Sequence, residues 1–145
     1  MDYIIRSLRK SDADKGYLKV LSVLTDTPQI EPVKWNYIID EVSNNPDLTI
    51  LVAIDNDNGK IIGCATLLCE QKIIHGGASI GHIEDVVTVS EYQHKGIASS
   101  LIKALIERAK ERKCYKVILS CDKDTIPFYE RLGFRTNETE MRIDL

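Results

Sequence analysis

The chain has 145 residues, a net charge of −3 and a pI of about 5.6. This length suits one domain with a substantial buried core, so we expect a single domain over residues 1–145. Hydrophobic residues make up 43% and charged residues 28%, which is the balance of a soluble globular protein. The acidic balance argues against a nucleic-acid partner, so a phosphorylated ligand would have to be held by local groups.

The location that the sequence predicts is the cytoplasm. Residues 1–6 contain both acid and base where a signal peptide needs an unbroken apolar run, so no such peptide is expected. No segment approaches the roughly 20 apolar residues of a membrane span, and we expect no membrane partner.

The four cysteines all lie in or beside apolar runs, and none belongs to a C-x-x-C pair. This pattern favours buried thiols over disulfides. Cys121 is the cysteine nearest the candidate site described below, and without an evident activating base we expect it to be a buried, inert thiol. The three histidines lack ligand spacing, so we expect no metal ion.

The first half of the chain reads as a strand, two helices and a hairpin. The hairpin signal is strong, because Asp-Asn-Asp-Asn-Gly at 55–59 separates two apolar runs. Pro32 suits the first turn of the second helix. The expected elements are a strand over 3–8, helices from about Asp12 to Leu24 and from about Pro32 to Val42, and strands over about 48–55 and 60–72.

The second half reads as a βαβ unit followed by a short helix and a last strand. A strand, a crossover helix and a further strand imply parallel pairing. The fold class predicted is therefore α/β, with a mixed, mostly antiparallel sheet, a C-terminal βαβ unit and helices on both faces. The expected elements are strands over about 80–89 and 115–121, helices over about 96–112 and 125–132, and a final strand near 138–143.

A Gly-containing segment lies where the predicted strand meets the long amphipathic helix. It reads Gln93-His94-Lys95-Gly96-Ile97-Ala98. Gly96 lets the backbone approach a ligand closely, and the N–H groups and dipole of a helix start favour an anion such as a pyrophosphate. Judged on spacing alone, an ordinary strand-to-helix turn explains this glycine equally well.

The pattern Gln-x-x-Gly-x-Ala resembles the acetyl-CoA pyrophosphate loop of the GNAT N-acetyltransferase superfamily, although Gly is commoner there at the position of Ala98. The segment Phe128–Phe134 resembles that family's "FYxxxGF" segment, and the order of elements agrees over essentially the whole chain. The resemblance implies a GNAT fold and acetyl-CoA as co-substrate.

Three further segments resemble the eukaryotic glucosamine 6-phosphate N-acetyltransferases. They are Lys72-Ile73-Ile74-His75, Gly81-His82-Ile83-Glu84-Asp85-Val86 and Cys114-Tyr115-Lys116. Members of that family are small single-domain homodimers that supply UDP-N-acetylglucosamine biosynthesis. The resemblance therefore implies acetyl transfer from acetyl-CoA to the amine of D-glucosamine 6-phosphate, giving N-acetylglucosamine 6-phosphate and CoA.

Two adjacent carboxylates, Glu84 and Asp85, interrupt an otherwise apolar strand. Neighbouring strand residues point to opposite faces unless a bulge intervenes, and at least one of the pair should lie in a functional pocket. The resemblance implies that Asp85 lies near the acceptor and positions or deprotonates its ammonium group, with Glu84 contributing beside it. The residues alone also allow a solvated or ion-paired acidic pair at a strand end.

The resemblance assigns a coenzyme-binding and leaving-group set around these acids. The backbone of Val86 and Val87 would pair with the pantetheine amides, although both valines could equally be core residues. Tyr129 would donate to the thiolate as it leaves, which makes it a catalytic residue beside Glu84 and Asp85. The remaining coenzyme-binding residues are Gln93, His94, Lys95, Gly96, Ile97, Ala98, Glu130 and Arg131.

The acceptor site that the resemblance implies is assembled from several segments, with part of it supplied by a second subunit. Lys72 and Lys116 could hold the phosphate as point charges. Two positions depart from the family pattern, since Ser120 and Asp144 stand where an acidic and a basic residue are usual, with Asp122 and Arg142 nearby. The acceptor residues so assigned are Thr25, Lys72, Ile73, Ile74, His75, Glu84, Asp85, Tyr115 and Lys116.

Two other functions stay open at this point. The chain could be a GNAT enzyme for another amine, such as a polyamine or a peptide N-terminus, which an acidic groove would favour. It could also be a catalytically silent acyl-CoA-binding module, although the presence of Glu84, Asp85 and Tyr129 argues against that. Direct attack in a ternary complex is expected rather than a covalent route through Cys121.

Overall fold

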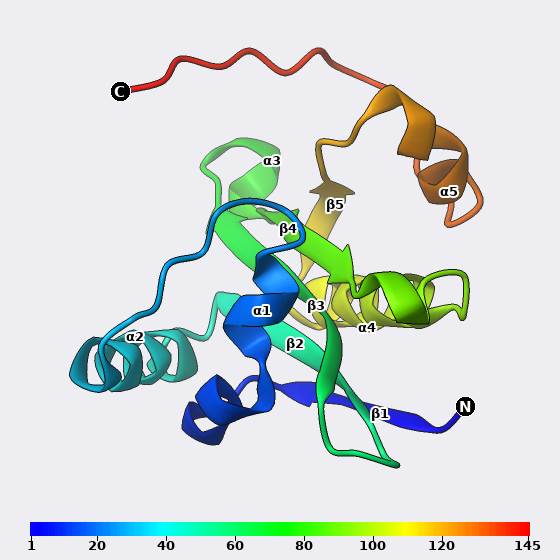
Figure 1. Ribbon diagram of the computed structural model, residues 1–145. Helices are drawn as coiled ribbons and strands as arrows, with labels where there is room; N and C mark the ends of the chain where they lie inside the picture. Colours follow the sequence, from blue (N-terminus) through cyan, green and yellow to red (C-terminus); the bar gives the residue numbers. More distant parts are fainter.

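One five-stranded sheet organises the computed structural model, which describes residues 1–145 (Figure 1). The strands lie in chain order; the first four pair antiparallel, and the last two pair parallel. The mixed, mostly antiparallel sheet and the parallel C-terminal pair confirm the predicted fold class. The strands are β1 (Tyr3–Ser7), β2 (Leu48–Asp55), β3 (Ile61–Gln71), β4 (Ser79–Thr88) and β5 (Cys114–Ile118).

Helices cover both faces of this sheet, as the sequence predicts. The long helix α4 (Ile97–Glu111) packs on one face, with its apolar stripe against one core cluster. The helices α1 (Tyr17–Leu21) and α2 (Pro32–Asn44) cover the other face and build a second cluster with it. Strand residues alternate between the two clusters because successive side chains point to opposite faces.

The prediction of one continuous helix from Asp12 to Leu24 is wrong, because the segment is divided into two short helices. The segment forms a 3₁₀ helix η1 (Lys10–Lys15), then Gly16 in the left-handed region at φ +88°, then the short α1. Gly16 ends one helix and begins the next, because a left-handed residue cannot continue an α-helix.

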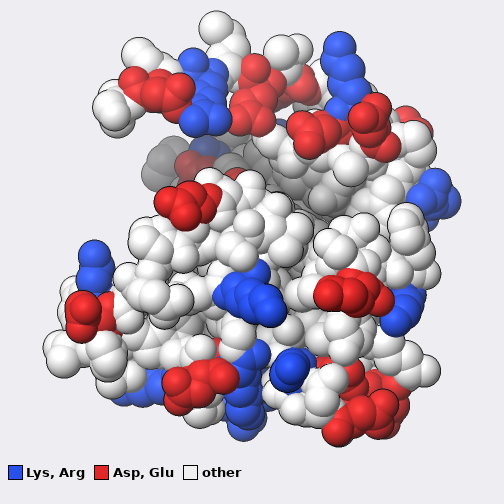
Figure 2. Space-filling model, in the orientation of Figure 1, with Lys and Arg blue, Asp and Glu red and all other residues white.

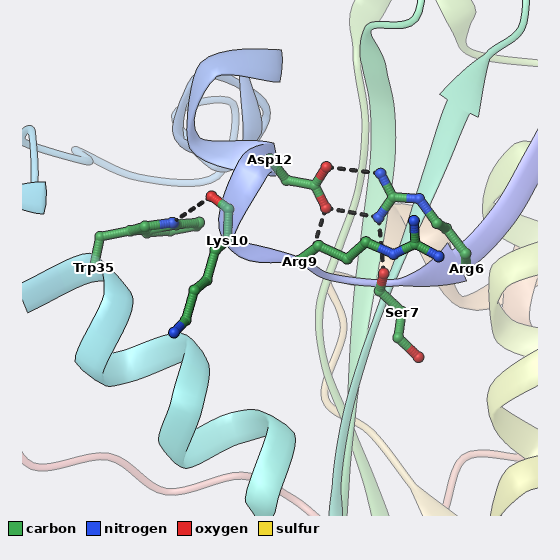
Figure 3. Close-up of polar contacts among 6 residues, drawn as sticks. All are labelled: Arg6, Ser7, Arg9, Lys10, Asp12 and Trp35. Carbon is green, nitrogen blue, oxygen red and sulfur yellow. Dashed lines mark hydrogen bonds and ion pairs between the residues drawn. The ribbon is translucent and has the colours of Figure 1, made fainter.

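Asp12 explains why the first part of that segment does not join the α-helix. It is fully buried and accepts two hydrogen bonds of 2.7 Å from the Arg6 guanidinium and one of 2.8 Å from the Arg9 backbone N–H (Figure 3). Burial on its own raises the pKa of Asp12, but these bonds and the charge of Arg6 outweigh it and hold the pKa below its ordinary value. The ion pair therefore fastens η1 to β1.

The predicted final strand near 138–143 is absent, and this prediction is wrong for the single chain. After Phe134 the chain forms a C-terminal tail, residues 135–145, without regular secondary structure, that runs along one side of the molecule (Figure 1). Met141 and Ile143 are 93% and 84% exposed. An extended segment becomes a strand only by pairing with another strand, and nothing in the chain pairs with this one.

The remaining elements are short. They are α3 (Ile74–Gly77), η2 (Ser90–Tyr92), η3 (Lys123–Thr125) and α5 (Ile126–Glu130). The helices at 32–44, 97–111 and 126–130 and the strands at 48–55, 61–71 and 79–88 agree with the predicted ranges within a few residues.

None of the helices combines the length and the apolar character that crossing a bilayer requires. On the face in Figure 2, basic and acidic side chains are interspersed, with no continuous basic patch.

Candidate active site

The sheet opens where β4 and β5 part. The two strands pair only from Ser79 to His82 on β4, and β5 ends at Ile118 opposite His82. From there β4 continues to Thr88 with β3 as its only strand partner. Its other edge carries backbone N–H and C=O groups without a strand partner, and such an edge can accept an extended ligand.

A β-bulge lies at this opening, on the acidic pair itself. Cys64 pairs with Val87 and Thr66 with Glu84, so two residues of β4, Asp85 and Val86, face the single Ala65. Asp85 has φ +51°, a left-handed conformation that is uncommon for a residue other than glycine. Glu84 and Asp85 are both exposed. The structure thus contains the bulge that the alternation argument had left open.

The neighbours of Asp85 on the α1 side of the sheet are buried and apolar. Burial raises the pKa of the Cys64 thiol to about 12, and the charge of Asp85 contributes to this. Burial likewise raises the pKa of the Tyr17 phenol, with smaller effects from Cys64 and Asp85. Both groups therefore stay neutral at physiological pH and bring no charge of their own to the acid pair.

The turn that precedes α4 is exposed and has an unusual backbone. His94 has φ +61° and Gly96, the N-cap residue, has φ +81°, and no side chain caps the helix. The first backbone bond of the helix runs from the Ser100 N–H to the Gly96 carbonyl, so the preceding N–H groups have no partner within the helix. A Cβ added at Gly96 would meet nothing within 4 Å. These features leave unpartnered N–H groups open to solvent at a helix N-terminus, which is the arrangement that favours an anion.

Three residues assigned to coenzyme binding have side chains that belong to the core. Ile97 and Val87 are 1% and 4% exposed, in the α4-side and α1-side clusters respectively, and Val86 packs partly buried on the α4 side. Only the backbone of Ile97 and Val87 is available to a ligand, whereas the side chain of Val86 stays partly exposed. The valines can thus be core residues and strand-edge residues at once, as both interpretations of the sequence allowed.

Tyr129 lies on α5 with its ring held between two phenylalanines. Phe128 and Phe134 contact it edge to face, at centroid distances of 5.0 and 5.9 Å. The phenol oxygen takes part in no hydrogen bond within the chain. Burial raises the pKa of Tyr129 above its ordinary value, and the neighbouring Cys121 raises it further. The phenol is therefore protonated at neutral pH and available as a donor.

The structure brings together two of the segments assigned to the acceptor. The His75 ring packs on the Tyr115 ring with centroids 4.2 Å apart, which joins α3 to the start of β5. The Lys116 ammonium lies 5.7 Å from the centroid of the Tyr115 ring. His75 has φ +54°, and beside it Ile73 and Ile74 are exposed by 94% and 59%.

Lys72 is not a free cation in this structure. Its ammonium pairs with Glu70 at 2.5 Å, and the second oxygen of Glu70 lies 2.8 Å from His82 Nε2. These hydrogen bonds hold the pKa of Glu70 below its ordinary value, and the one from Lys72 has the larger effect. A phosphate bound by Lys72 would therefore have to compete with Glu70 for it.

Other predicted residues lie apart or differ from expectation. Thr25 is exposed in the loop between α1 and α2, and no hydrogen bond joins it to the His75–Tyr115 pair. Cys121 is exposed, so the prediction of a buried thiol is wrong there; the chain leaves β5 at Ile118 and reaches Cys121 in an irregular segment. A cavity of about 260 Å³ is lined by Ser120, Cys121, Asp122 and Glu140.

A cavity of about 600 Å³ lies elsewhere, between β1, α2, the start of β2 and the last turns of α4, and none of the predicted site residues lines it. No group of three or more His, Cys, Asp or Glu side chains is placed to hold a metal ion. The candidate site is an open strand edge rather than a closed pocket, so cavity size is a poor guide to it.

Sequence reasoning assigned Lys72 to the site but missed its partner Glu70, and it also missed Tyr17. Glu70 lies two positions before Lys72, near the end of β3, and this spacing of opposite charges could have revealed the ion pair. Tyr17 carried no such signal, because a lone aromatic residue in a helix is more often simply packed.

Comparisons with known proteins agree with this geometry. Residues 15–134 match the acetyltransferase (GNAT) family. The chain is 37% identical over 145 residues to a glucosamine 6-phosphate N-acetyltransferase of Trypanosoma brucei brucei, covering 100% of this chain and 97% of the relative. A relative of the same name from Candida albicans is 33% identical, with coverage of 96% and 93%.

A solved structure is similar over nearly the whole length. The crystal structure of glucosamine-6-phosphate N-acetyltransferase from Arabidopsis thaliana has a TM-score of 0.96 and 30% identity, with 99% of each chain covered. The parted strands, the bulge and the Gly96 turn thus occur in a chain whose relatives are acetyltransferases. The family expectation is confirmed: this chain belongs to the GNAT family of acetyltransferases.

Proposed function

We propose that this chain transfers the acetyl group of acetyl-CoA to the amine of D-glucosamine 6-phosphate. The observation that carries the proposal is the free edge of β4 beyond His82, which leads through the bulge at Asp85 to the exposed N–H groups at the start of α4. An extended pantetheine can add to that edge while its diphosphate reaches the helix start. The names of the relatives support the acceptor.

In the proposed complex the amine attacks the thioester carbonyl directly. A C–N bond forms and the C–S bond breaks. The ammonium group must lose one proton before attack, the nitrogen loses a second proton as the amide forms, and the thiolate gains one. Asp85, exposed at the bulge with Glu84 beside it, orients the ammonium group and receives its proton directly or through water. Tyr129, protonated at neutral pH, donates to the departing sulfur. Glu130 and Arg131 complete the coenzyme side.

The acceptor side would use the segments that meet at the His75–Tyr115 stack. Lys72 and Lys116 lie near this stack in sequence and can attract the phosphate as point charges. The cavity beside Ser120 and Asp122 offers hydroxyl and carboxylate oxygens for the sugar. Thr25 would join from the loop after α1.

We also propose a homodimer in which a second copy completes this acceptor site. Met141, Ile143 and Leu145 occupy alternate positions of the tail and are 84% or more exposed. Alternation of this kind is the pattern of a strand with one buried face. The edge strand β5 exposes Tyr115 and Ile118, which gives the tail of a partner an apolar surface to cover. The whole chain would act as one cytoplasmic acetyltransferase domain.

The test is CoA release against a panel of amines, measured with free-thiol detection. We expect release with glucosamine 6-phosphate and a kcat/KM at least about tenfold lower with unphosphorylated glucosamine, since a charged hydrogen bond is lost. Turnover only with a polyamine or a peptide N-terminus would replace the proposed acceptor. Acetyl-CoA binding without turnover on any amine would identify a silent binding module.

A further inference from the structure

The turn that receives the proposed diphosphate is tied to a distant hairpin. Tyr92 is the last residue of η2 and directly precedes Gln93. Its phenol donates a hydrogen bond of 2.8 Å to Oδ2 of Asp55, the last residue of β2. The contact joins residues 37 positions apart and links the β2–β3 hairpin to the start of the α4 turn.

Asp55 is itself held rigidly by the hairpin. It is only 5% exposed, Oδ1 accepts a 2.9 Å bond from the Asp57 backbone N–H, and Oδ2 accepts a 2.8 Å bond from the Asn58 amide. The pKa of Asp55 lies below its ordinary value, chiefly because of the hydrogen bond from the Asp57 N–H. The hydrogen bonds from Tyr92 and Asn58 and the charge of Lys95 lower it further. A charged, fully partnered carboxylate is thus the anchor for the Tyr92 phenol.

Lys95 also contacts Tyr92. Its ammonium lies 4.9 Å from the centroid of the Tyr92 ring, a cation–π distance. The two residues on either side of it, His94 and Gly96, have φ of +61° and +81°. Glycine adopts such a φ freely, but for His94 it is an uncommon conformation that persists only when surrounding contacts hold it. The bond from Tyr92 to Asp55 is such a contact, at the entrance of the turn.

We propose that Asp55 is a positioning residue for the coenzyme: acting through Tyr92, it holds Lys95 and the turn before α4 ready to receive the diphosphate. The inference rests on the proposed coenzyme site, and none of the segments that carry the family resemblance includes Asp55 or Tyr92. Its physical basis is preorganisation, because a turn and a cation already in place lose less conformational freedom on binding. Asp55 itself touches neither substrate.

The test compares Asp55→Asn and Tyr92→Phe with the matched controls Asp57→Asn and Tyr37→Phe. The Asp57 side chain is exposed in the same turn, and Tyr37 is 64% exposed on α2. We expect the KM and Kd for acetyl-CoA to rise about three- to tenfold in the first two variants, the worth of one hydrogen bond, with kcat at saturation unchanged. The controls should match the wild type.

A second donor separates positioning from a general loss of structure. Acetyl-pantetheine carries the thioester but no diphosphate, so its KM should be the same in Asp55→Asn, Tyr92→Phe and the wild type. The double variant should be no worse than either single one, because both remove the same link. An unchanged KM for acetyl-CoA in both variants, or an equal loss with acetyl-pantetheine, would overturn the proposal.

The proposed function can fail separately. If the wild type acetylates no amine, the affinities for CoA and pantetheine are measured by calorimetry on the same four variants. A three- to tenfold weaker Kd for CoA alone in Asp55→Asn and Tyr92→Phe still supports positioning. Equal CoA affinity in all variants still refutes it.

Discussion

The coenzyme side and the acceptor side of the candidate site differ in how far one chain completes them. On the coenzyme side, the turn before α4 is tied to the hairpin through Tyr92, and the first turn of α4 is tied to β1 through the 2.8 Å hydrogen bond between Tyr3 and Ser100. On the acceptor side, Ile73 is 94% exposed, Lys72 is paired with Glu70, and the tail that follows α5 stays uncovered.

The coenzyme half of the candidate site depends on local geometry, and we expect the acceptor half to depend on association of two chains. A helix N-terminus with a left-handed glycine can bind an anion without residues from other segments, because its free backbone N–H groups donate the hydrogen bonds. A sugar-phosphate site needs several side chains from separate segments, and exposed apolar surface beside them indicates a further surface that covers it. We therefore expect variants on the two sides to affect different substrates.

The largest effect is expected from Tyr129→Phe. Loss of the phenol removes the proton donor to the leaving thiolate, so kcat should fall about 100-fold with little change in the Kd for acetyl-CoA. Steady-state CoA release and calorimetry measure the two quantities. Tyr37→Phe, exposed on α2, is the control. An unaltered kcat would remove Tyr129 from the leaving-group role.

Gly96→Val tests the coenzyme side. A valine at φ +81° is strained and fills the open space above the helix start, so the Kd for acetyl-CoA should rise about 30-fold. Gly16→Val is the matched control. Gly16 has φ +88° and equally free surroundings, but it lies between η1 and α1, far along the sequence from the turn before α4. Normal affinity in Gly96→Val would mean that the diphosphate binds elsewhere.

Ile143→Lys tests the acceptor side. A charge on the apolar face of the tail should shift the protein towards monomer and raise the KM for glucosamine 6-phosphate about tenfold, with the Kd for acetyl-CoA unchanged. Light scattering and kinetics measure both. Thr136→Lys adds the same charge at the start of the tail as the control. A variant with the wild-type oligomeric state and KM contradicts the role of the tail.

Lys72→Met is expected to act on the phosphate alone. The KM for glucosamine 6-phosphate should rise about fivefold, less than for a free cation because Glu70 already competes for Lys72. The KM for unphosphorylated glucosamine should stay the same. Lys19→Met on α1 is the control, and an equal change with both sugars would assign Lys72 a structural role.

The smallest expected effect is a loss of folding stability at low pH. The pKa of Asp12 lies below its ordinary value of 3.8 in the folded protein, so its ion pair with Arg6 contributes stability that is fully present above that value. That contribution is lost only as the pH falls further, through the lowered pKa. Urea unfolding as a function of pH should therefore show a loss below about pH 3.8 that Asp12→Asn lacks. The same slope in both proteins would contradict this assignment.

Much of the fold follows from local patterns. Apolar periodicity predicts α2, α4 and the strands β2 to β4 within a few residues, and the hairpin residues predict the turn after Asp55. The helix over 12–24 could not be predicted correctly, because its break depends on the partners of Asp12 and on Gly16. The predicted last strand near 138–143 is absent, because alternating apolar residues show that a face can be buried but not what buries it.

The candidate site was predicted unevenly. The Gly96 turn has a sequence signal, because helix start, glycine and strand are neighbours along the chain. The stack of His75 on Tyr115 joins residues 40 positions apart, and the hydrogen bond from Tyr92 to Asp55 joins residues 37 positions apart. No local pattern encodes such pairs.

By itself the sequence determined the order of the strands and main helices up to α5, the family and the position of the turn before α4, because all three depend on periodicity and on short motifs that residues close in the chain can express. Only the tertiary structure decided the bulge at Asp85, the parting of β4 from β5 and the capture of Lys72 by Glu70. These features depend on register and on pairing between strands. A strand carries its own pattern of apolar residues, but its register is chosen jointly with its neighbour.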